Sequence, residues 1–341
     1  MGKYCQHNAR YKKLQYYLTS FLHQKIYPRA LKLRYQQRSY KLLEDPQVAR
    51  RLFKRVNYYC KINSHFELID ESSIPQCDHT LYRTNKNDIF SLDCASAYRI
   101  DCARYLSCFA KPFHCHFLPG DITQIPQIPA LLKSRPISQD DSNAHSCLLK
   151  LNRIRHFNFI HDTIANYDKK PKIVWRGAVS QPHRRHFIEK FFDHPLMDVG
   201  QTNQPAAKGY KPRMSISEQL GYQFILSIEG NDVASNLKWV LSSQSLCFMT
   251  KPKYETWFME AELVPGVHYV EVKDDYSDLA DKVLYYTNHL DEAEVIIQQA
   301  NLYCQKFMNQ NEEDLINFLV LEKFFHCSGQ IESVYAQYFD E

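Results

Sequence analysis

The stretch QFILSIEGNDVASNLKWVLSS, residues 223–243, joins two apolar runs through a short polar segment that contains one glycine. The first part, QFILSIEG, is typical of a buried strand, and VASNLKWVLSS is typical of a helix. Gly230 allows the backbone to turn sharply between them. The start of the predicted helix would supply unpaired N–H groups and about half a positive charge, to which Lys238 adds its own. The turn is therefore a candidate anion site, or a plain strand-to-helix connection.

Strands and helices alternate along the chain from Lys172 onward. We expect strands at 172–179, 197–201, 223–230, 245–250 and 267–272, and helices at 182–192, 215–222, 233–243, 254–263 and 277–327. This alternation predicts an α/β fold with a parallel sheet and helices on both of its faces. Ligands of such sheets lie at the carboxyl ends of the strands, which is where the turn around Gly230 falls.

A second predicted strand end in the same region carries arginines. The segment VWRGAVSQPHRRHF places Arg176 beside Gly177, with Arg184 and Arg185 in the helix that follows. A guanidinium group is planar and can bind a phosphate through two parallel N–H bonds. A surface salt bridge is the alternative role for each arginine. Two such strand ends in one domain favour a diphosphate ligand.

The segment PGDITQIPQIPALLKSRPI, residues 119–137, is rich in proline, which excludes a regular helix. We expect a long ordered loop, a feature that is often functional in compact domains. Asp121 lies near its start, where an aspartate after Pro-Gly can also simply bond its own backbone. Lys133 and Arg135 form a basic element that could bind an acceptor or close a cleft. Short strands are expected around this loop, at 65–70 and 115–120.

The N-terminal region is strongly basic. Between Arg10 and Arg55 it contains thirteen Lys or Arg residues against two acids, Glu44 and Asp45, interleaved with aromatic and aliphatic residues. We expect a helical arm over residues 8–58. Its charge suits an anionic membrane surface or a phosphorylated glycolipid, since each Lys or Arg near an acidic membrane contributes about 1 kcal/mol. The alternatives are nucleic acid, which we set aside, and a solvated basic face that packs its tyrosines inward.

Composition limits the class of protein. At 341 residues and 44% hydrophobic, the chain is long enough for two domains, and its aromatic share of 13% argues against disorder. It shows no signal peptide and no apolar run of the ~20 residues that a membrane span needs, so we expect a cytoplasmic protein. The 11 cysteines predict reduced thiols. The densest group, Cys102 to His116, contains no C-x2-C pair, and zinc there is the less favoured alternative.

Several motifs of the chain together resemble those of family 90 glycosyltransferases. They are FLPGDITQIPQIP, KSRPI, WRGAVSQPHRR and the run from YQFILSIEG to DDYSDL, spread over roughly residues 90–290. The family includes eukaryotic protein O-glucosyltransferases, fungal capsule-associated xylosyltransferases and bacterial lipopolysaccharide core glycosyltransferases, and the bacterial branch is the most similar. The resemblance implies a GT-B fold, in which two Rossmann-like domains face a cleft and the C-terminal one holds the nucleotide. It also implies inverting transfer from a UDP-sugar without an essential metal.

The resemblance assigns roles to individual positions. Asp121 matches the family's general base. Arg176, beside Gly177 in an aromatic-Arg-Gly motif, matches an arginine that contacts the donor diphosphate, and Arg184 matches a second arginine. Glu229 is a candidate contact for sugar hydroxyls, because a carboxylate can accept from two vicinal hydroxyls. The matching nucleotide-sugar loop consists of Gly230, Asn231, Asp232, Val233, Ala234 and Ser235.

One position departs from the family pattern. Eukaryotic members carry an arginine where this chain has Asn236, and we expect Lys238 to take over part of its phosphate role. The chain also contains no Asp-x-Asp pair, the usual holder of a divalent ion on a nucleotide sugar. Cationic side chains must then neutralise the leaving diphosphate. The candidates are Arg176, Arg184 and Lys238.

These interpretations combine into one expected architecture and activity. We expect a basic arm at 1–58, an acceptor-side domain with the base at 59–165, a nucleotide-sugar-binding domain at 166–310 and a C-terminal helix at 311–341 that packs on the N-terminal domain. The enzyme would need no cofactor. It would move glucose or galactose from a UDP-sugar to a core sugar of lipopolysaccharide or lipooligosaccharide, with heptose favoured, on the inner face of the inner membrane.

Two other classes of protein stay open. One is a catalytically inactive peripheral membrane or glycolipid-binding protein of the same fold. The other is a nucleotide-dependent enzyme of different chemistry, such as a sugar-phosphate hydrolase or a kinase, although the chain has no Walker loop.

Overall fold

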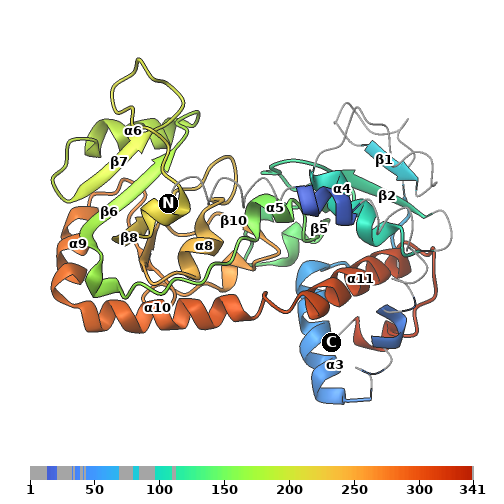
Figure 1. The fold of residues 1–341 in the computed structure, drawn as a ribbon. Helices are drawn as coiled ribbons and strands as arrows, with labels where there is room; N and C mark the ends of the chain where they lie inside the picture. The colour runs from blue at the N-terminus through green and yellow to red at the C-terminus, as the bar shows by residue number, and fades with distance from the viewer. Residues whose placement is uncertain are drawn as a thin grey trace. The chain divides into compact units, whose positions relative to one another are not determined.

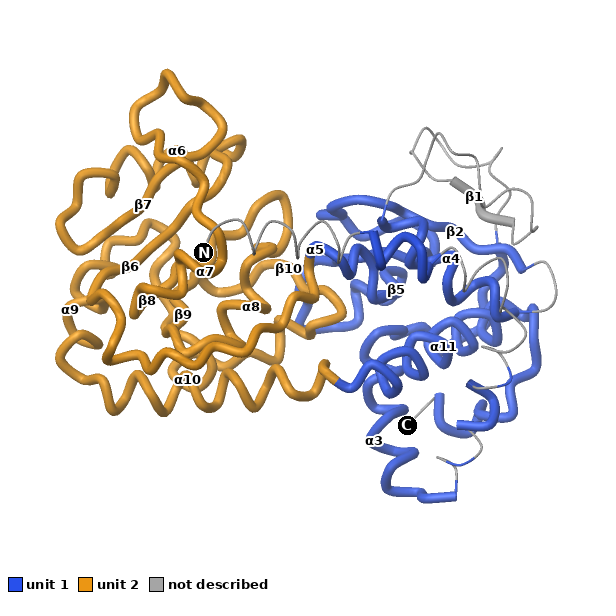
Figure 2. The backbone as a smooth tube through the Cα atoms, viewed as in Figure 1, with its two compact units in different colours: residues 1–155, 309–341 blue, residues 156–308 orange. Residues whose placement is uncertain are grey.

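The structure is a computed structural model that describes residues 14–20, 33, 35–38, 41, 44–68, 80–83, 97–109 and 113–339. The chain forms two compact units, which Figure 2 shows in different colours. Unit 1 consists of residues 1–155 and 309–341, and unit 2 of residues 156–308. The chain thus leaves unit 1 once and returns to it for its last residues.

Unit 2 is built on a parallel sheet of five strands in the order β11–β9–β8–β6–β7 (Figure 1). Neighbouring strands of this sheet are all parallel, which confirms the predicted α/β fold with a parallel sheet. β7 lies on one side of β6 and β8 on the other, so the strand order reverses at β6. Ligands of open α/β sheets bind at the carboxyl ends of the strands beside such a switch point. The strands are β6 (Lys170–Gly177), β7 (Met197–Gln201), β8 (Tyr222–Leu226), β9 (Leu246–Met249) and β11 (Val270–Glu271).

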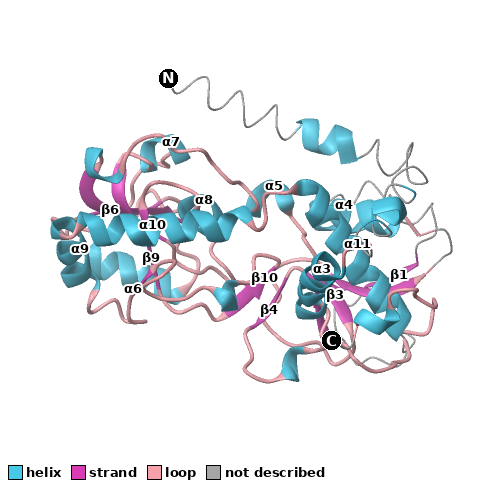
Figure 3. Cartoon of the chain, turned by 90° about the horizontal axis from the view of Figure 1, so that it is seen from below, coloured by secondary structure: helices cyan, strands magenta, loops and turns pink. Residues whose placement is uncertain are grey.

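Helices bury the apolar faces of this sheet. Every second strand residue, such as Trp175, Phe224 and Phe248, joins one buried cluster with side chains of α6 (Pro182–Phe191), α9 (Leu279–Asn288) and α10 (Leu290–Gln305). Figure 3 shows α9 and α10 lying across the strands. Strand side chains of the other parity point to the opposite face, and α8 (Leu237–Leu241) packs against β9.

The helix starts in unit 2 follow local sequence rules. α6 has a proline at its first position, where the missing N–H has no intrahelical partner in any case. α7 (Ile216–Gln219) begins with the predicted capping box, in which Ser215 and Glu218 each bond the other's backbone N–H.

Three helix predictions in this region need correction. The helix expected at 233–243 begins only at Leu237, so residues 227–236 form a loop and Gly230 is not at a helix start. The helix expected at 254–263 is wrong: β10 (Tyr254–Thr256) is followed by a turn and the short 3-10 helix η6 (Glu260–Glu262). The cause is tertiary, because Met259 has a left-handed φ of 56° and the Glu260 carboxylate is bonded within the core. The helix expected at 277–327 is broken after Asn288 and Gln305, into α9, α10 and α11 (Gln310–Cys327).

Unit 1 contains a smaller mixed sheet in the order β1–β2–β3–β5. β1 (Thr80–Arg83) is antiparallel to β2 (His114–Leu118), whereas β2, β3 (Ala130–Leu132) and β5 (Ser146–Leu148) are mutually parallel. β2 confirms the strand predicted at 115–120. The Pro-rich segment is irregular at 119–129, but β3 and β4 (Ser134–Pro136) fall inside the predicted loop.

Two helices from opposite ends of the sequence pack together in unit 1: α3 (Pro46–Tyr59) and α11 (Figure 1). Asp45 caps α3 by accepting from the N–H groups of Gln47 and Val48. The unit also contains α4 (Ala97–Leu106) and α5 (Arg153–His156), which ends at the unit boundary. Acidic residues of α11 are buried against basic partners; Glu313 pairs with Arg55 and Lys150, and Asp314 with Arg104.

Much of the predicted basic arm lies outside the described residues. Residues 14–20 and α3 are helical, as expected, and Pro46 begins α3 as a separate helix. Residues 65–68 are irregular, so the described part of the strand expected at 65–70 is not a strand. Within the described part of the chain, none of the helices combines the length and apolarity that crossing a membrane requires.

Candidate active site

Asp121, the predicted general base, lies just past the carboxyl end of β2 in unit 1. Its Oδ1 accepts a hydrogen bond from Lys133 Nζ at 2.6 Å and another from the Tyr98 hydroxyl at 3.1 Å. Lys133 follows β3, the parallel neighbour of β2, so adjacent strand ends bring the carboxylate and the ammonium together. The Lys133 side chain is 2% exposed and that of Asp121 24%. The carboxylate is thus partly open to solvent, whereas its cationic partner is not.

Tyr98 was not predicted from the sequence. It lies in α4, and its ring also faces the ammonium of Lys133, which is 5.7 Å from the ring centroid. Burial raises the pKa of Tyr98, as does the charge of Asp121, against the opposing effect of Lys133. The hydroxyl therefore keeps its proton at neutral pH and acts as a donor to Asp121.

Arg135, predicted together with Lys133 to bind an acceptor, is fully buried. Its guanidinium group donates to the carbonyl oxygens of Tyr58 at 2.7 Å and Ser146 at 3.0 Å. These bonds tie the end of α3 to the start of β5. These contacts give Arg135 a structural role within unit 1.

Arg176 lies at the carboxyl end of β6, at the switch point of the unit 2 sheet. Its Nη1 donates to the carbonyl oxygens of Trp175 and Asp198, and its Nη2 donates to Asp198 Oδ1 at 2.7 Å. Asp198 also accepts from Lys211 and from the Tyr222 hydroxyl. Burial acts to raise the pKa of Asp198, but the hydrogen bonds from Lys211, Tyr222 and Arg176 outweigh it and hold the pKa well below its usual range.

One N–H group of the Arg176 guanidinium, the Nε–H, has no hydrogen-bond partner among the described residues. The Arg176 side chain is only 8% exposed, and its Nε–H is buried. Nε and Nη2 share one edge of the planar guanidinium group, the geometry that binds carboxylate or phosphate through two bonds. A buried donor without a partner costs about 1–3 kcal/mol. An anion at this edge would remove that cost.

Arg184, from α6, holds the loops after β6 and β8 together. It donates from Nη2 to the Ile228 carbonyl at 2.7 Å, from Nε to the Glu229 carbonyl at 2.9 Å and from Nη1 to the Ala178 carbonyl at 3.2 Å. Its guanidinium carbon lies 5.6 Å from the Trp175 ring centroid. Arg184 therefore shapes the switch point by fixing backbone on both sides of it.

Two glycines of the predicted motifs lie close to these side chains. A Cβ on Gly177 would lie 2.4 Å from the Trp175 ring, so only glycine fits there. A Cβ on Gly230 would meet Arg184 Nη2 at 3.4 Å, which is ordinary van der Waals contact.

The remainder of the predicted nucleotide-sugar loop is ordered by its own contacts. Gly230 N–H donates to the Asp232 carbonyl at 2.9 Å, and Asn231 Oδ1 accepts from Gln181 at 2.9 Å. Asp232, Val233 and Ala234 are buried and Ser235 is exposed. Asn236 closes the loop, because its Nδ2 donates to the Leu226 carbonyl at 3.0 Å and its Oδ1 accepts from Ser227 at 3.1 Å.

Lys238, the predicted substitute for the missing arginine, is fully buried in α8. Its ammonium forms an ion pair with Glu260 at 2.5 Å and lies 5.3 Å from the centroid of the Phe258 ring. Glu260 also accepts from Thr256 N at 2.6 Å. The charge of Lys238 is therefore already balanced inside unit 2, and we assign it a structural role.

Glu229 is a titratable group in the loop after β8. Burial raises the pKa of Glu229 to about 7, although the N–H groups of Lys253 and Tyr254 act to lower it. The Lys253 N–H reaches Oε1 at 3.1 Å. The Glu229 carboxyl group therefore binds its proton more tightly than an exposed glutamate does.

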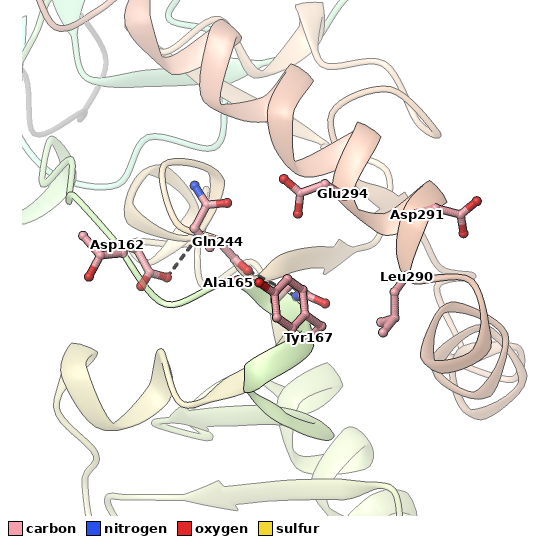
Figure 4. Close-up of a pocket in the computed structure, with 9 residues that line it drawn as sticks. Asp162, Ala165, Tyr167, Gln244, Leu290, Asp291 and Glu294 are labelled. Carbon is pink, nitrogen blue, oxygen red and sulfur yellow. Dashed lines mark hydrogen bonds between the residues drawn. The ribbon is translucent and has the colours of Figure 1, made fainter.

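A pocket of about 510 Å³ lies elsewhere in unit 2. Its lining includes Asn166 and Tyr167, just before β6, and Gln244, just before β9, so it lies at the amino-terminal end of the strands. Figure 4 shows Glu294 and Asp291 of α10 at this pocket. None of the site residues predicted from the sequence lines it. The switch-point chemistry, rather than this pocket, marks the candidate site.

The described residues contain no group of three or more His, Cys, Asp or Glu that could hold a metal ion. The described cysteines are buried free thiols, and burial raises the pKa of Cys115 to about 12. The thiols of the Cys102 to His116 segment thus belong to the core.

Comparison with known proteins identifies the family. Residues 155–322 match the model of Glycosyl transferase family 90. The chain is also 41% identical over 275 residues to the O-glucosyltransferase LpsA of Dichelobacter nodosus, a match that covers 80% of this chain and 81% of that protein. The chain belongs to glycosyltransferase family 90. This confirms the resemblance found in its motifs.

More distant relatives match part of the chain. Protein O-glucosyltransferase 3 of Homo sapiens is 25% identical over 165 residues, which are 46% of this chain and 32% of the human protein. Protein O-glucosyltransferase 2 of Danio rerio is 28% identical over 133 residues, 37% of this chain and 26% of that protein. The part of the chain that matches the family model includes the whole switch point of unit 2.

Sequence reasoning missed the partners of the predicted residues. Asp198 could have been recognised from the sequence, because it is an acidic residue inside the predicted strand 197–201. Tyr98 carried none, since it lies 23 residues before Asp121 in a segment without a recognisable motif.

Proposed function

We propose that this family 90 enzyme transfers a hexose from a UDP-sugar to a core sugar of lipopolysaccharide or lipooligosaccharide, with heptose as the favoured acceptor. One observation supports the UDP-sugar donor. Arg176, at the switch point, has a buried Nε–H that no described residue accepts. The name of the Dichelobacter relative, an O-glucosyltransferase, favours glucose over galactose. The acceptor class rests on the resemblance to the bacterial branch of the family.

The proposed reaction is a single displacement at the anomeric carbon. The acceptor hydroxyl oxygen forms the new bond to that carbon while the bond to the diphosphate oxygen breaks, and UDP leaves with the electron pair. The hydroxyl proton passes to the Asp121 carboxylate. General base catalysis by a positioned group contributes typically about 10²–10⁴-fold. Because base and leaving group lie on opposite faces of the sugar, the configuration inverts.

Cationic and polar groups of unit 2 would stabilise the departing diphosphate. Arg176 offers the edge formed by Nε and Nη2, held in place by Asp198. Arg184 acts indirectly, because its donors fix the loops that surround the nucleotide. Glu229, at the start of that loop, is the proposed contact for a sugar hydroxyl. Fixed donors of this kind stabilise developing charge without reorganising during the reaction.

Further parts of the proposal concern arrangement and location. The GT-B arrangement, in which the two units face each other across the substrates, rests on the family resemblance. So do the independence from metal and the lack of another cofactor. The basic N-terminal segment is the proposed contact with the anionic inner face of the inner membrane, where the acceptor would be presented.

A donor screen tests this function. Purified protein is mixed with UDP-glucose, UDP-galactose or another UDP-sugar, with and without truncated lipooligosaccharide, and UDP release is measured. We expect acceptor-dependent release that is fastest with UDP-glucose, in the presence of EDTA as well as without it. Binding of glycolipid without any UDP release would point to the inactive binding protein instead. Release that does not depend on the acceptor would contradict the transferase.

A further inference from the structure

We propose that Lys133 and Tyr98 are positioning residues that hold the Asp121 carboxylate in the orientation needed to accept the acceptor's proton. The inference rests on the proposed function, in which Asp121 is the general base. It replaces the acceptor-binding role that the sequence suggested for Lys133. The two roles differ in what they require of the lysine and in the kinetic constant that they affect.

The surroundings of Lys133 favour a role inside the protein. Its side chain is 2% exposed, and the ammonium is 2.6 Å from Asp121 Oδ1. A lysine that recruits an anionic acceptor from a membrane needs an exposed ammonium with a free path to its partner. A charge-assisted hydrogen bond of this length is instead roughly twice as strong as a neutral one and fixes the carboxylate to which it is made.

Tyr98 supplies a second contact from a different element. Its hydroxyl, carried by α4, donates to the same oxygen, Asp121 Oδ1, at 3.1 Å. The Asn152 side chain is hydrogen-bonded to the Tyr98 hydroxyl in turn. Asn152 has a left-handed φ of 53°, a conformation that costs energy outside glycine and that clusters at functional sites. Two donors from two directions leave the carboxylate little freedom to rotate.

The backbone next to Asp121 is held by hydrogen bonds that do not involve Lys133. The Ser134 hydroxyl accepts from Ile122 N and donates to the Ile122 carbonyl, both at 3.1 Å. These bonds link the loop after β2 to the residue that follows Lys133. Removing the Lys133 ammonium therefore leaves the loop attached, and the expected loss is one of carboxylate orientation rather than of fold.

The test measures kcat and KM for the acceptor in Lys133→Met, Lys133→Arg and Tyr98→Phe. Lys54→Met, at an exposed lysine of α3, and Tyr338→Phe, whose hydroxyl makes no described hydrogen bond, are the matched controls. We expect Lys133→Met to lower kcat about 10–100-fold and to change the acceptor KM by less than about twofold. Tyr98→Phe removes one neutral hydrogen bond and should lower kcat about 3–10-fold. Lys133→Arg should recover part of the loss.

A pH profile and a binding measurement separate positioning from simple loss of structure. In Lys133→Met the acidic limb of the kcat/KM profile should move to higher pH, because the cation beside the base is gone. Lys133→Ala should regain activity with propylamine but not with propanol. UDP binding and the melting temperature should stay near those of the wild type. A variant that fails to melt cooperatively is replaced in the comparison by Tyr98→Phe, which keeps the ring.

The outcomes distinguish this inference from the function on which it rests. If Asp121→Asn abolishes transfer but Lys133→Met and Tyr98→Phe keep the wild-type kcat and pH profile, the positioning role is wrong and the function stands. If Lys133→Met raises the acceptor KM at unchanged kcat, the acceptor-binding role is right instead. If Asp121→Asn itself turns over normally, the proposed base is wrong.

Discussion

Lys238→Met gives the sharpest test of how the predicted donor cations are actually used. Lys238 and Glu260 are 0% and 1% exposed, and the ammonium and carboxylate are 2.5 Å apart. Removing the ammonium leaves the Glu260 carboxylate buried with only Thr256 as a described donor. Breaking a buried ion pair on one side costs about 3–5 kcal/mol. A folded domain has a free energy of unfolding of about 5–15 kcal/mol. Lys238→Met should therefore lose a large part of the stability of unit 2, but not necessarily all of it.

Tryptophan fluorescence during urea unfolding measures this loss in unit 2 specifically. The three tryptophans of the chain, Trp175, Trp239 and Trp257, all lie in that unit. Lys208→Met is the control, because the Lys208–Asp193 pair has side chains that are 71% and 76% exposed. An exposed pair of this kind contributes about 0–1 kcal/mol, so the control should unfold nearly as the wild type does.

A second variant tests whether the unpaired Glu260 carboxylate causes the loss of stability. Lys238→Met combined with Glu260→Gln removes both charges and keeps an oxygen that accepts from Thr256. Replacing a buried pair by neutral groups is often close to neutral, so the double variant should regain most of the lost stability. UDP affinity should stay within about twofold of the wild type in variants that fold. A loss of less than 1 kcal/mol in Lys238→Met together with much weaker UDP binding would refute the structural role and restore the phosphate contact.

Three further variants probe the switch point. Because its folded pKa of about 7 lies above the unfolded value of 4.5, Glu229 contributes stability that is complete below pH 4.5 and lost as pH rises through about 7. Glu229→Gln should abolish that pH dependence of the urea midpoint. Asp198→Asn should destabilise unit 2 by about 2–4 kcal/mol and weaken UDP binding about tenfold, since Asp198 no longer holds the Arg176 guanidinium in place; unchanged calorimetric affinity would disprove the link. Gly177→Ala should cost about 1–3 kcal/mol through its clash with Trp175, whereas Gly221→Ala, with its nearest contact at 3.4 Å, should unfold like the wild type.

The fold of unit 2 was largely readable from the sequence because its determinants are local. Apolar runs such as residues 223–226 are short, lack glycine and proline, and alternate with amphipathic segments, which predicts a parallel sheet. The helix predicted at 254–263 was wrong because the strand, turn and 3-10 helix found there depend on long-range contacts. They depend on the left-handed Met259 and on the ion pair between Glu260 and Lys238. Such long-range contacts override helix propensity and leave no periodic trace.

The candidate site was readable in part, for the same reason. Arg176 lies at the end of a predicted strand and Asp121 just after one, so their positions at strand ends could be predicted, and the family motifs drew attention to both. The partners that fix them could not be predicted. Lys238 looks like an available cation in the sequence, and only the packing of α8 shows that it faces Glu260 inside the core. Tyr98 reaches Asp121 through the tertiary position of α4.

The most direct test of the central claim is transfer by Asp121→Asn. The variant keeps the size of the side chain and an oxygen that accepts from Lys133, but it removes the basic carboxylate. Sugar transfer is followed by mass spectrometry of the glycolipid product, and UDP binding by calorimetry. The account predicts transfer slowed by at least about 10²-fold with UDP affinity unchanged. Turnover near that of the wild type would contradict it.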